Sequence, residues 1–164
     1  QTTYQSFMIV QASSAYQSLE DLRGKTFAFT DPMSNTGYFY PLSLLRMMEE
    51  TPESYFNRTL FTYSHDHSIN AVAEGFVDGA SVDNLILEHA QRRNQELADH
   101  VRVISKSEKF GIPPVVIPKQ LDQQKKEQFE NLFLNIHNHE TGRQALENLG
   151  IEKFIKPNID LYNF

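Results

Sequence analysis

Short apolar strands alternate with helical periodicities from the start of the chain to Ser105, and this alternation restricts the fold more than any other feature. Between two of these strands, Ile69, Val72, Ala73 and Phe76 recur at the i, i+3, i+4, i+7 spacing of an amphipathic helix. The pattern predicts an α/β fold, with a mostly parallel sheet covered by helices on both faces. The predicted strands cover residues 7–10, 25–30, 59–63, 79–82, 101–105 and 115–118.

The pattern changes from Leu121 onward, where two helical periodicities follow one another without an intervening strand. The second of them ends at Gly150, a residue type that commonly closes helices. We therefore divide the chain into an α/β ligand-binding lobe over residues 1–118 and a helical segment over residues 119–164.

Composition excludes several classes of function. The 164 residues can bury one real core, and they include no cysteine, so disulfides and thiolate chemistry are excluded. The net charge of −6 argues against nucleic-acid partners and anionic membranes. No apolar run approaches the ~18 residues of a membrane span. A single small anion remains compatible with this charge, because local dipoles can hold it.

Polar clusters follow three of the predicted strands, at residues 31–37, 63–68 and 83–84. Parallel strands would bring these clusters to one edge, where ligands bind in open α/β sheets. In the first cluster, Ser34-Asn35-Thr36-Gly37 opens a helix. Hydroxyls, an amide and unpaired N–H groups at a helix N-terminus favour an anion.

Two other interpretations compete with an anion site. The same Ser, Asn, Thr and Asp side chains are often plain helix caps, in which case Ser34→Ala and Thr36→Ala would each cost ~1 kcal/mol of stability without affecting any ligand. Alternatively, a metal-assisted hydrolase would use His65, Asp66, His67 and Asp83. No third ligand of strong spacing supports a metal, and we predict no cofactor and no catalytic residue.

Two separated motifs resemble one family. LEDLRGKTFAFTDPMSNTGYFYP, from Leu19, and YSHDHSINAVAEGFVDGASVD, from Tyr63, are similar to the hallmark segments of the periplasmic phosphonate-, phosphite- and phosphate-binding proteins of ABC importers. The two motifs occur in the family's order at similar spacing. A weaker resemblance continues through FGIPPVVIP and the terminal helices, so it covers nearly the whole chain.

The resemblance implies a type II solute-binding protein, which has two lobes that close on the ligand and has no catalytic activity. Carried over by position, it implies that a phosphorus oxyanion is held by six residues: Ser34, Asn35, Thr36, His65, Tyr4 and Asp83. A dianion beside His65 would raise the pKa of that ring, so we expect tighter binding toward mildly acidic pH.

Two departures from the family pattern are informative. Members that bind aminoalkyl phosphonates have an acid after the IP segment, whereas Gly111-Ile112-Pro113-Pro114 is followed by Val115. Phosphate, phosphite or a simple alkyl phosphonate is therefore the expected ligand. The chain also lacks the family's first segment, so we expect an excised piece in which residues 119–164 return to a missing or partial first lobe.

The resemblance also implies a location and partners. We expect a periplasmic protein that serves an ABC transporter permease, or an extracytoplasmic sensor domain fused to a signalling protein. Direct membrane insertion and nucleic-acid binding are not expected. An exposed apolar face left by the missing lobe would favour a homodimer.

Overall fold

The computed structural model describes residues 2–162, apart from the side chain of Ala98. Its contacts divide the chain into two compact units, Gln1–Phe110 and Gly111–Phe164. Each unit is described below by itself.

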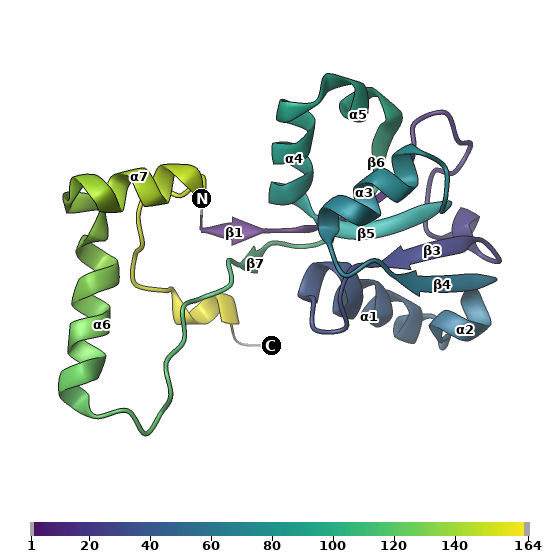
Figure 1. The fold of residues 1–164 in the computed structure, drawn as a ribbon. Helices are drawn as coiled ribbons and strands as arrows, with labels where there is room; N and C mark the ends of the chain where they lie inside the picture. The colour runs from purple at the N-terminus through teal and green to yellow at the C-terminus, as the bar shows by residue number, and fades with distance from the viewer. Residues whose placement is uncertain (1, 163–164) are drawn as a thin grey trace. The chain divides into compact units, whose positions relative to one another are not determined.

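Unit 1 is built on a five-stranded sheet in the order β4-β3-β5-β2-β6 (Figure 1). The strands of the chain are β1 (Thr3–Tyr4), β2 (Ser6–Gln11), β3 (Thr26–Phe29), β4 (Arg58–Phe61), β5 (Gly79–Asp83), β6 (Val101–Lys106) and β7 (Phe110–Gly111). The five predicted strands up to Ser105 are confirmed. Strand β3 pairs in parallel with β4 and β5, whereas β2 is antiparallel to both β5 and β6. Strands β3, β4, β5 and β6 therefore run in one direction, and β2 alone among these five runs in the opposite direction.

The reversal of β2 determines which residues share an edge of the sheet. Ser6, at the start of β2, lies opposite Asp83, at the end of β5. The residues that enter β2 consequently lie at the same edge as the carboxyl ends of β3, β4 and β5. We call this edge the rim.

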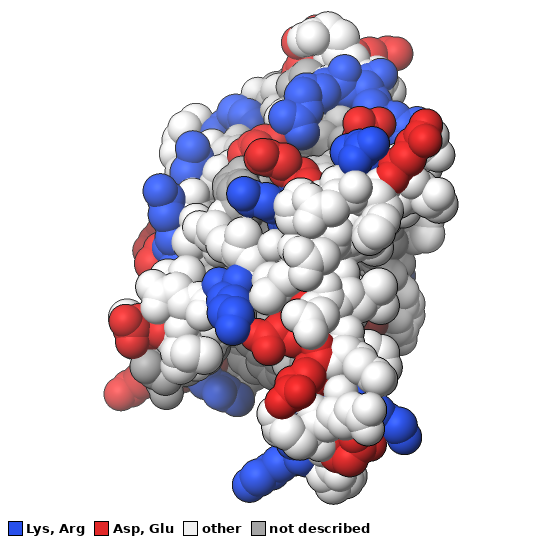
Figure 2. All heavy atoms as spheres, turned by 90° about the vertical axis from the view of Figure 1, so that its left-hand side faces the viewer, with Lys and Arg blue, Asp and Glu red and all other residues white. Residues whose placement is uncertain are grey.

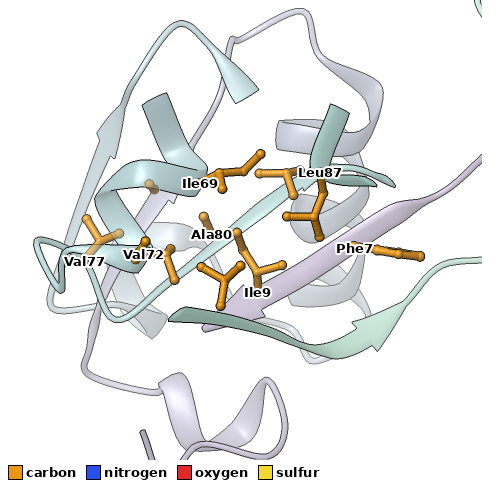
Figure 3. Packing of buried hydrophobic residues seen from close by; sticks show 11 residues of the cluster. Phe7, Ile9, Ile69, Val72, Val77, Ala80 and Leu87 are labelled. Carbon is orange, nitrogen blue, oxygen red and sulfur yellow. The ribbon is translucent and has the colours of Figure 1, made fainter. Parts of the chain in front are cut away.

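Helices cover both faces of the sheet, as the sequence predicts. The helices of unit 1 are η1 (Glu20–Leu22), η2 (Asn35–Phe39), α1 (Tyr40–Met47), α2 (Pro52–Tyr55), α3 (His65–Ala73), α4 (Asn84–Arg93) and α5 (Gln95–His100). One face packs its odd-numbered β2 residues, Phe7 and Ile9, against Ile69 and Val72 of α3 and Leu87 of α4 (Figure 3).

The opposite face carries the even-numbered β2 residues Met8 and Val10. They form a second core with Leu45 of α1, Tyr55 of α2 and aromatic residues of β3. Within this core Phe27 stacks on Phe56, with ring centroids 4.5 Å apart. Both sides of β2 are thus buried, which explains why its sequence reads as a continuous apolar run.

Two local predictions in unit 1 are wrong. Phe76 was expected on the buried face of α3, but that helix ends at Ala73 and the Phe76 side chain is 74% exposed. Ser18, with Asp21 three residues later, predicts a capping box, but η1 has no side-chain hydrogen bond from its N-cap and only the Asp21 half forms: its carboxylate accepts the backbone N–H groups of Gln17 and Ser18. Gly24, which the sequence predicts as the end of this helix, follows it at φ +71°.

Unit 2 contains α6 (Gln123–Asn135), η3 (Ile136–Asn138), α7 (Glu140–Asn148) and η4 (Ile159–Tyr162). Both predicted helices are confirmed, but the predicted strand at residues 115–118 is wrong, because that segment is not assigned to any strand. No residue of α6 is buried within the part of the chain that the structure describes, and Phe129 and Leu132 are 42% and 56% exposed.

The face of the molecule in Figure 2 does not concentrate one sign of charge. On the face shown in Figure 2, Lys and Arg side chains are interspersed with Asp and Glu. Among the described residues, no helix combines the length and apolar character needed to cross a bilayer.

Candidate anion-binding site

Three helices begin at the rim, each directly after one of the parallel strands. The segment η2–α1 follows β3, α3 follows β4 and α4 follows β5. Each start presents backbone N–H groups and the positive end of a helix dipole. The polar clusters predicted from sequence are the residues at these three helix starts.

Ser34 is the N-cap of η2. Its Oγ accepts a hydrogen bond from the N–H of Gly37 at 3.0 Å, and its carbonyl oxygen accepts from Tyr38 and Phe39. The hydroxyl proton of Ser34 is still available, because a hydroxyl can donate while it accepts. Within residues 2–162, the N–H groups of Asn35 and Thr36 have no hydrogen-bond partner. The helix start thus offers several uncharged donors.

Asn35 connects this turn to the strand that precedes β2. Its Nδ2 donates to the hydroxyl oxygen of Tyr4 over 3.2 Å. Tyr4 itself is only 6% exposed and its ring packs edge-on against Phe110, with centroids 6.0 Å apart. The structure therefore places two of the six predicted residues in direct contact.

The main chain of Thr36 is held by two side chains of the sheet. Its carbonyl oxygen accepts hydrogen bonds from the Oγ atoms of Ser6 and Ser81, each at 2.7 Å. The two serines are fully buried, on β2 and β5. Sequence reasoning missed both, because a serine inside an apolar strand has no signal of its own in a single sequence.

Gly37 permits the close approach of this turn to β3. A Cβ added at Gly37 would lie 1.7 Å from Oγ1 of Thr30, a buried residue that follows β3. That Oγ1 atom is buried and has no hydrogen-bond partner among the described residues. No residue larger than glycine fits at position 37 unless the turn moves.

His65 is the first residue of α3, and its ring is oriented by β5. Its Nδ1 accepts a hydrogen bond from the backbone N–H of Asp83 over 3.0 Å. Because Nδ1 is the acceptor, the neutral ring carries its proton on Nε2, which can donate to a ligand.

Burial lowers the pKa of His65 below its usual 6.5, although the carboxylates of Asp83 and Asp66 oppose this shift. A proton on Nδ1 would also remove the acceptor for the Asp83 N–H. The surroundings of His65 therefore favour a neutral imidazole. This differs from the sequence-based expectation of a ring that readily charges beside the ligand.

Asp83 serves as the N-cap of α4. Its Oδ1 accepts from the N–H of Leu85 at 2.7 Å. Burial raises the pKa of this carboxyl, while the Leu85 N–H and nearby His65 oppose that shift. The contacts identify a capping role and place the carboxyl beside His65.

Strand β5 connects the two motifs that are distant in sequence. Ser81 holds the carbonyl of Thr36, and two residues later Asp83 holds the ring of His65. The turn at Ser34–Thr36 and the start of α3 are therefore fixed to neighbouring positions of one strand.

Tyr63 is the first residue of the second predicted polar cluster, although it was not among the six residues predicted to hold the anion. It has a left-handed backbone, with φ +58°, and its N–H donates to the Thr30 carbonyl at 2.6 Å. Non-glycine residues at positive φ are uncommon and tend to occur at functional sites. Its side chain is 72% exposed, directly before Ser64, the N-cap position of α3.

The metal-centre alternative receives no support from the geometry. Among residues 2–162, no three His, Asp or Glu side chains lie close enough to share one metal ion. Nδ1 of His67 lies 3.2 Å from the Thr62 carbonyl oxygen, while Nδ1 of His65 is engaged by Asp83.

Comparison with known proteins identifies the family of the chain. Residues 1–162 match the family described as the periplasmic substrate-binding protein of the phosphonate ABC transporter. The chain belongs to this family. The phosphonate-binding family comprises substrate-binding components of importers rather than enzymes, and its members are periplasmic.

Individual relatives support the assignment. The chain is 29% identical over 155 residues to the phosphonates-binding periplasmic protein of Escherichia coli K12, covering 92% of this chain and 46% of that protein. A binding protein component of an ABC phosphonate transporter from Pseudomonas aeruginosa is 29% identical, with a TM-score of 0.79 over 93% of this chain and 52% of that one.

A third likeness shows the fold alone. PhnD1 from Prochlorococcus marinus, solved with methylphosphonate, is 16% identical, with a TM-score of 0.77 over 98% of this chain and 64% of that one. The chain spans about half the length of the first two relatives. The type II binding-protein fold of the phosphonate-binding family is thus shown for the segment described here.

Proposed function

We propose that the rim of unit 1 binds a small phosphorus oxyanion, which is phosphonate, phosphite or phosphate. The donors are the Ser34 hydroxyl, the Asn35 amide, the N–H groups that open η2, and Nε2 of His65. The observation that carries the proposal is the attachment of both motifs to β5, through Ser81 and Asp83. This attachment brings the uncharged donors of the η2 start and the neutral ring of His65 to the same edge of the sheet. The positive ends of three helix dipoles at this edge favour a negatively charged ligand.

The roles of the six predicted residues follow from their contacts. We assign Ser34, Asn35 and His65 to direct donation, and Thr36 to donation through its backbone N–H. Tyr4 fixes the Asn35 amide and stays a candidate contact to the ligand. Asp83 orients His65 and caps α4, so we assign it a supporting role.

Unit 2 is the second part of the proposal. We infer that residues 119–164 complete the other lobe of a two-lobed receptor, of which unit 1 is the ligand-binding lobe. The exposed Phe129 and Leu132 of α6 support this inference, as does the half-length match to relatives. The receptor would work in the periplasm with an ABC permease. A fused signalling protein and a homodimer are the alternative contexts.

The test is a calorimetric titration of the protein with phosphate, phosphite, methylphosphonate and aminoethylphosphonate. Saturable binding that is weakened by roughly 10-fold or more in Ser34→Ala and His65→Ala is the expected result, with the aminated ligand weakest. The matched control is Ser43→Ala, since Ser43 Oγ is an exposed donor in α1 that bonds only the Tyr40 carbonyl among the described contacts. No binding of any of the four ligands would overturn the assignment.

A further inference from the structure

The carbonyl oxygen of Thr36 receives no donor from its own helix. In the π-helical turn of η2, the N–H of Tyr40 bonds to the carbonyl of Asn35. The next donor along the helix would be residue 41, which is Pro41 and has no N–H. Because Thr36 is only 2% exposed, its carbonyl needs a donor from elsewhere in the protein.

Two buried hydroxyls supply that donor. The Oγ atoms of Ser6 and Ser81 each lie 2.7 Å from the Thr36 oxygen and 2.7 Å from each other. Three short contacts therefore join three oxygens, but the two hydroxyls have only two protons to place between them.

The count of protons limits the arrangements to three. Both hydroxyls can donate to Thr36, or either one can donate to the other, which then donates to Thr36. In each arrangement the carbonyl accepts at least one hydrogen bond. Removal of one hydroxyl leaves the other with Thr36 as its remaining partner in this triangle. Removal of both leaves a buried carbonyl without a donor.

We propose that Ser6 and Ser81 are mutually redundant positioning residues that hold the start of the anion-binding helix through the Thr36 carbonyl. Either hydroxyl alone keeps the Ser34–Gly37 turn in place over the sheet, and loss of both releases it. The ligand-affinity part of this inference rests on the proposed function.

The experiment compares Ser6→Ala, Ser81→Ala and the double variant in anion titrations at a temperature where every variant is folded. Phosphate and methylphosphonate serve as the probes. We expect each single variant to lie within about 3-fold of the parent affinity and the double variant to be weaker by about 10-fold or more, since an unmade hydrogen bond to a buried carbonyl is costly. Additive small losses, or a full loss in one single variant, would overturn the redundancy.

A rescue variant separates positioning from a general loss of stability. Pro41→Ala restores an N–H at the position that the π turn would use for Thr36. The triple variant Ser6→Ala/Ser81→Ala/Pro41→Ala should recover most of the lost affinity, or recover folding if the double variant does not fold. No recovery in the triple variant would contradict the proposal. Thr51→Ala is the control, because it removes the side-chain cap of α2 and should lower stability without changing affinity.

Amide hydrogen exchange supplies a readout that needs no ligand. The N–H groups of Gly37, Tyr38 and Phe39 bond to Ser34 and report on the turn directly. Their protection should fall in the double variant and persist in both single variants. If the parent protein binds none of the anions, the proposed function fails while exchange still decides the role of the two serines. Unchanged protection in the folded double variant would overturn that role.

Discussion

The backbone N–H of Asp83 and the ring of His65 form a hydrogen bond in which Nδ1 is the acceptor, at 3.0 Å. A backbone donor cannot rotate away or change its charge. The bond therefore fixes both the orientation of the ring and the tautomer, and it leaves Nε2–H directed elsewhere as a donor. This one contact converts a histidine in a short polar motif into a defined hydrogen-bond donor.

The first prediction concerns the pH dependence of binding. Because burial lowers the pKa of His65 below its usual 6.5, the ring is mostly neutral from pH 7 to pH 8 and donates in that form. The contribution of His65 to anion affinity should therefore be nearly constant over this range. Titrations over this range, with the affinity corrected for the second ionisation of the ligand, measure the effect. His65→Ala should weaken binding by roughly 10-fold or more, as expected for a hydrogen bond to a charged group. A steep gain in affinity toward acid would indicate a protonated ring instead.

The second prediction concerns stability. The folded pKa of His65 is lowered, so the unfolded chain binds more protons between the folded pKa and about 6.5. The contribution of His65 is fully present above pH 6.5 and is lost as the pH falls through that window, with a slope of at most ~1.4 kcal/mol per pH unit. Urea unfolding of the parent and His65→Gln should diverge below pH 6.5. Parallel curves would contradict the burial of a neutral ring.

A third prediction addresses the close approach at Gly37. Gly37→Ala places a Cβ against Thr30, so it should cost about 2–3 kcal/mol and abolish anion binding. Gly24→Ala is the control, since a Cβ added at Gly24 would meet no atom within 4 Å. That control should cost only ~1 kcal/mol, from its positive φ, and keep the affinity. Chemical denaturation with titration of each variant distinguishes the two.

The fourth prediction separates capping from charge at Asp83. Asp83→Asn keeps an N-cap oxygen and removes a negative charge beside His65, so it should tighten anion binding by a few-fold at unchanged stability. Asp83→Ala should lose ~1 kcal/mol, because α4 loses its cap. Calorimetry and thermal unfolding of the pair provide the check. Weaker binding in Asp83→Asn would identify the carboxylate as a direct ligand contact.

The carboxyl of Asp83 also affects stability in acid, with the opposite sign from His65. Its folded pKa is raised, so its contribution is fully present below the usual 3.8 and is lost as the pH rises through the folded value. Replacement by Asn should therefore flatten this part of the stability curve.

Sequence reasoning predicted the layered α/β fold because strand runs and helical periodicities are local signals. It also placed all three polar clusters at one rim, since parallel strands bring their carboxyl ends together. The direction of β2 could not be predicted, because a buried apolar run has the same residue pattern in a parallel and in an antiparallel strand. The segment at residues 115–118 was misassigned for a related reason: an extended apolar run indicates a strand whether or not a partner strand is present.

The site residues show a similar limit. The motifs nominated His65, Thr36 and Asp83 individually, but they did not show that the Asp83 N–H orients the His65 ring. Ser6 and Ser81, which hold the Thr36 carbonyl, were not nominated. The tautomer of His65 and the donor to Thr36 depend on those tertiary contacts. A sequence pattern can therefore nominate a donor, but the groups that orient it appear only once the strands are paired.

The neighbouring positions of β2 and β6 have a consequence for engineering. Phe7 lies opposite Lys106, and the N–H of Ser107 donates to the carbonyl of Ser6, so the first and last strands of the five-stranded sheet start and finish side by side. A unit whose two ends meet in this way can be grafted into a surface loop of a host protein without stretching either junction. Unit 1 is thereby suited to insertion as a whole into another protein, with both junctions formed by two adjacent strands.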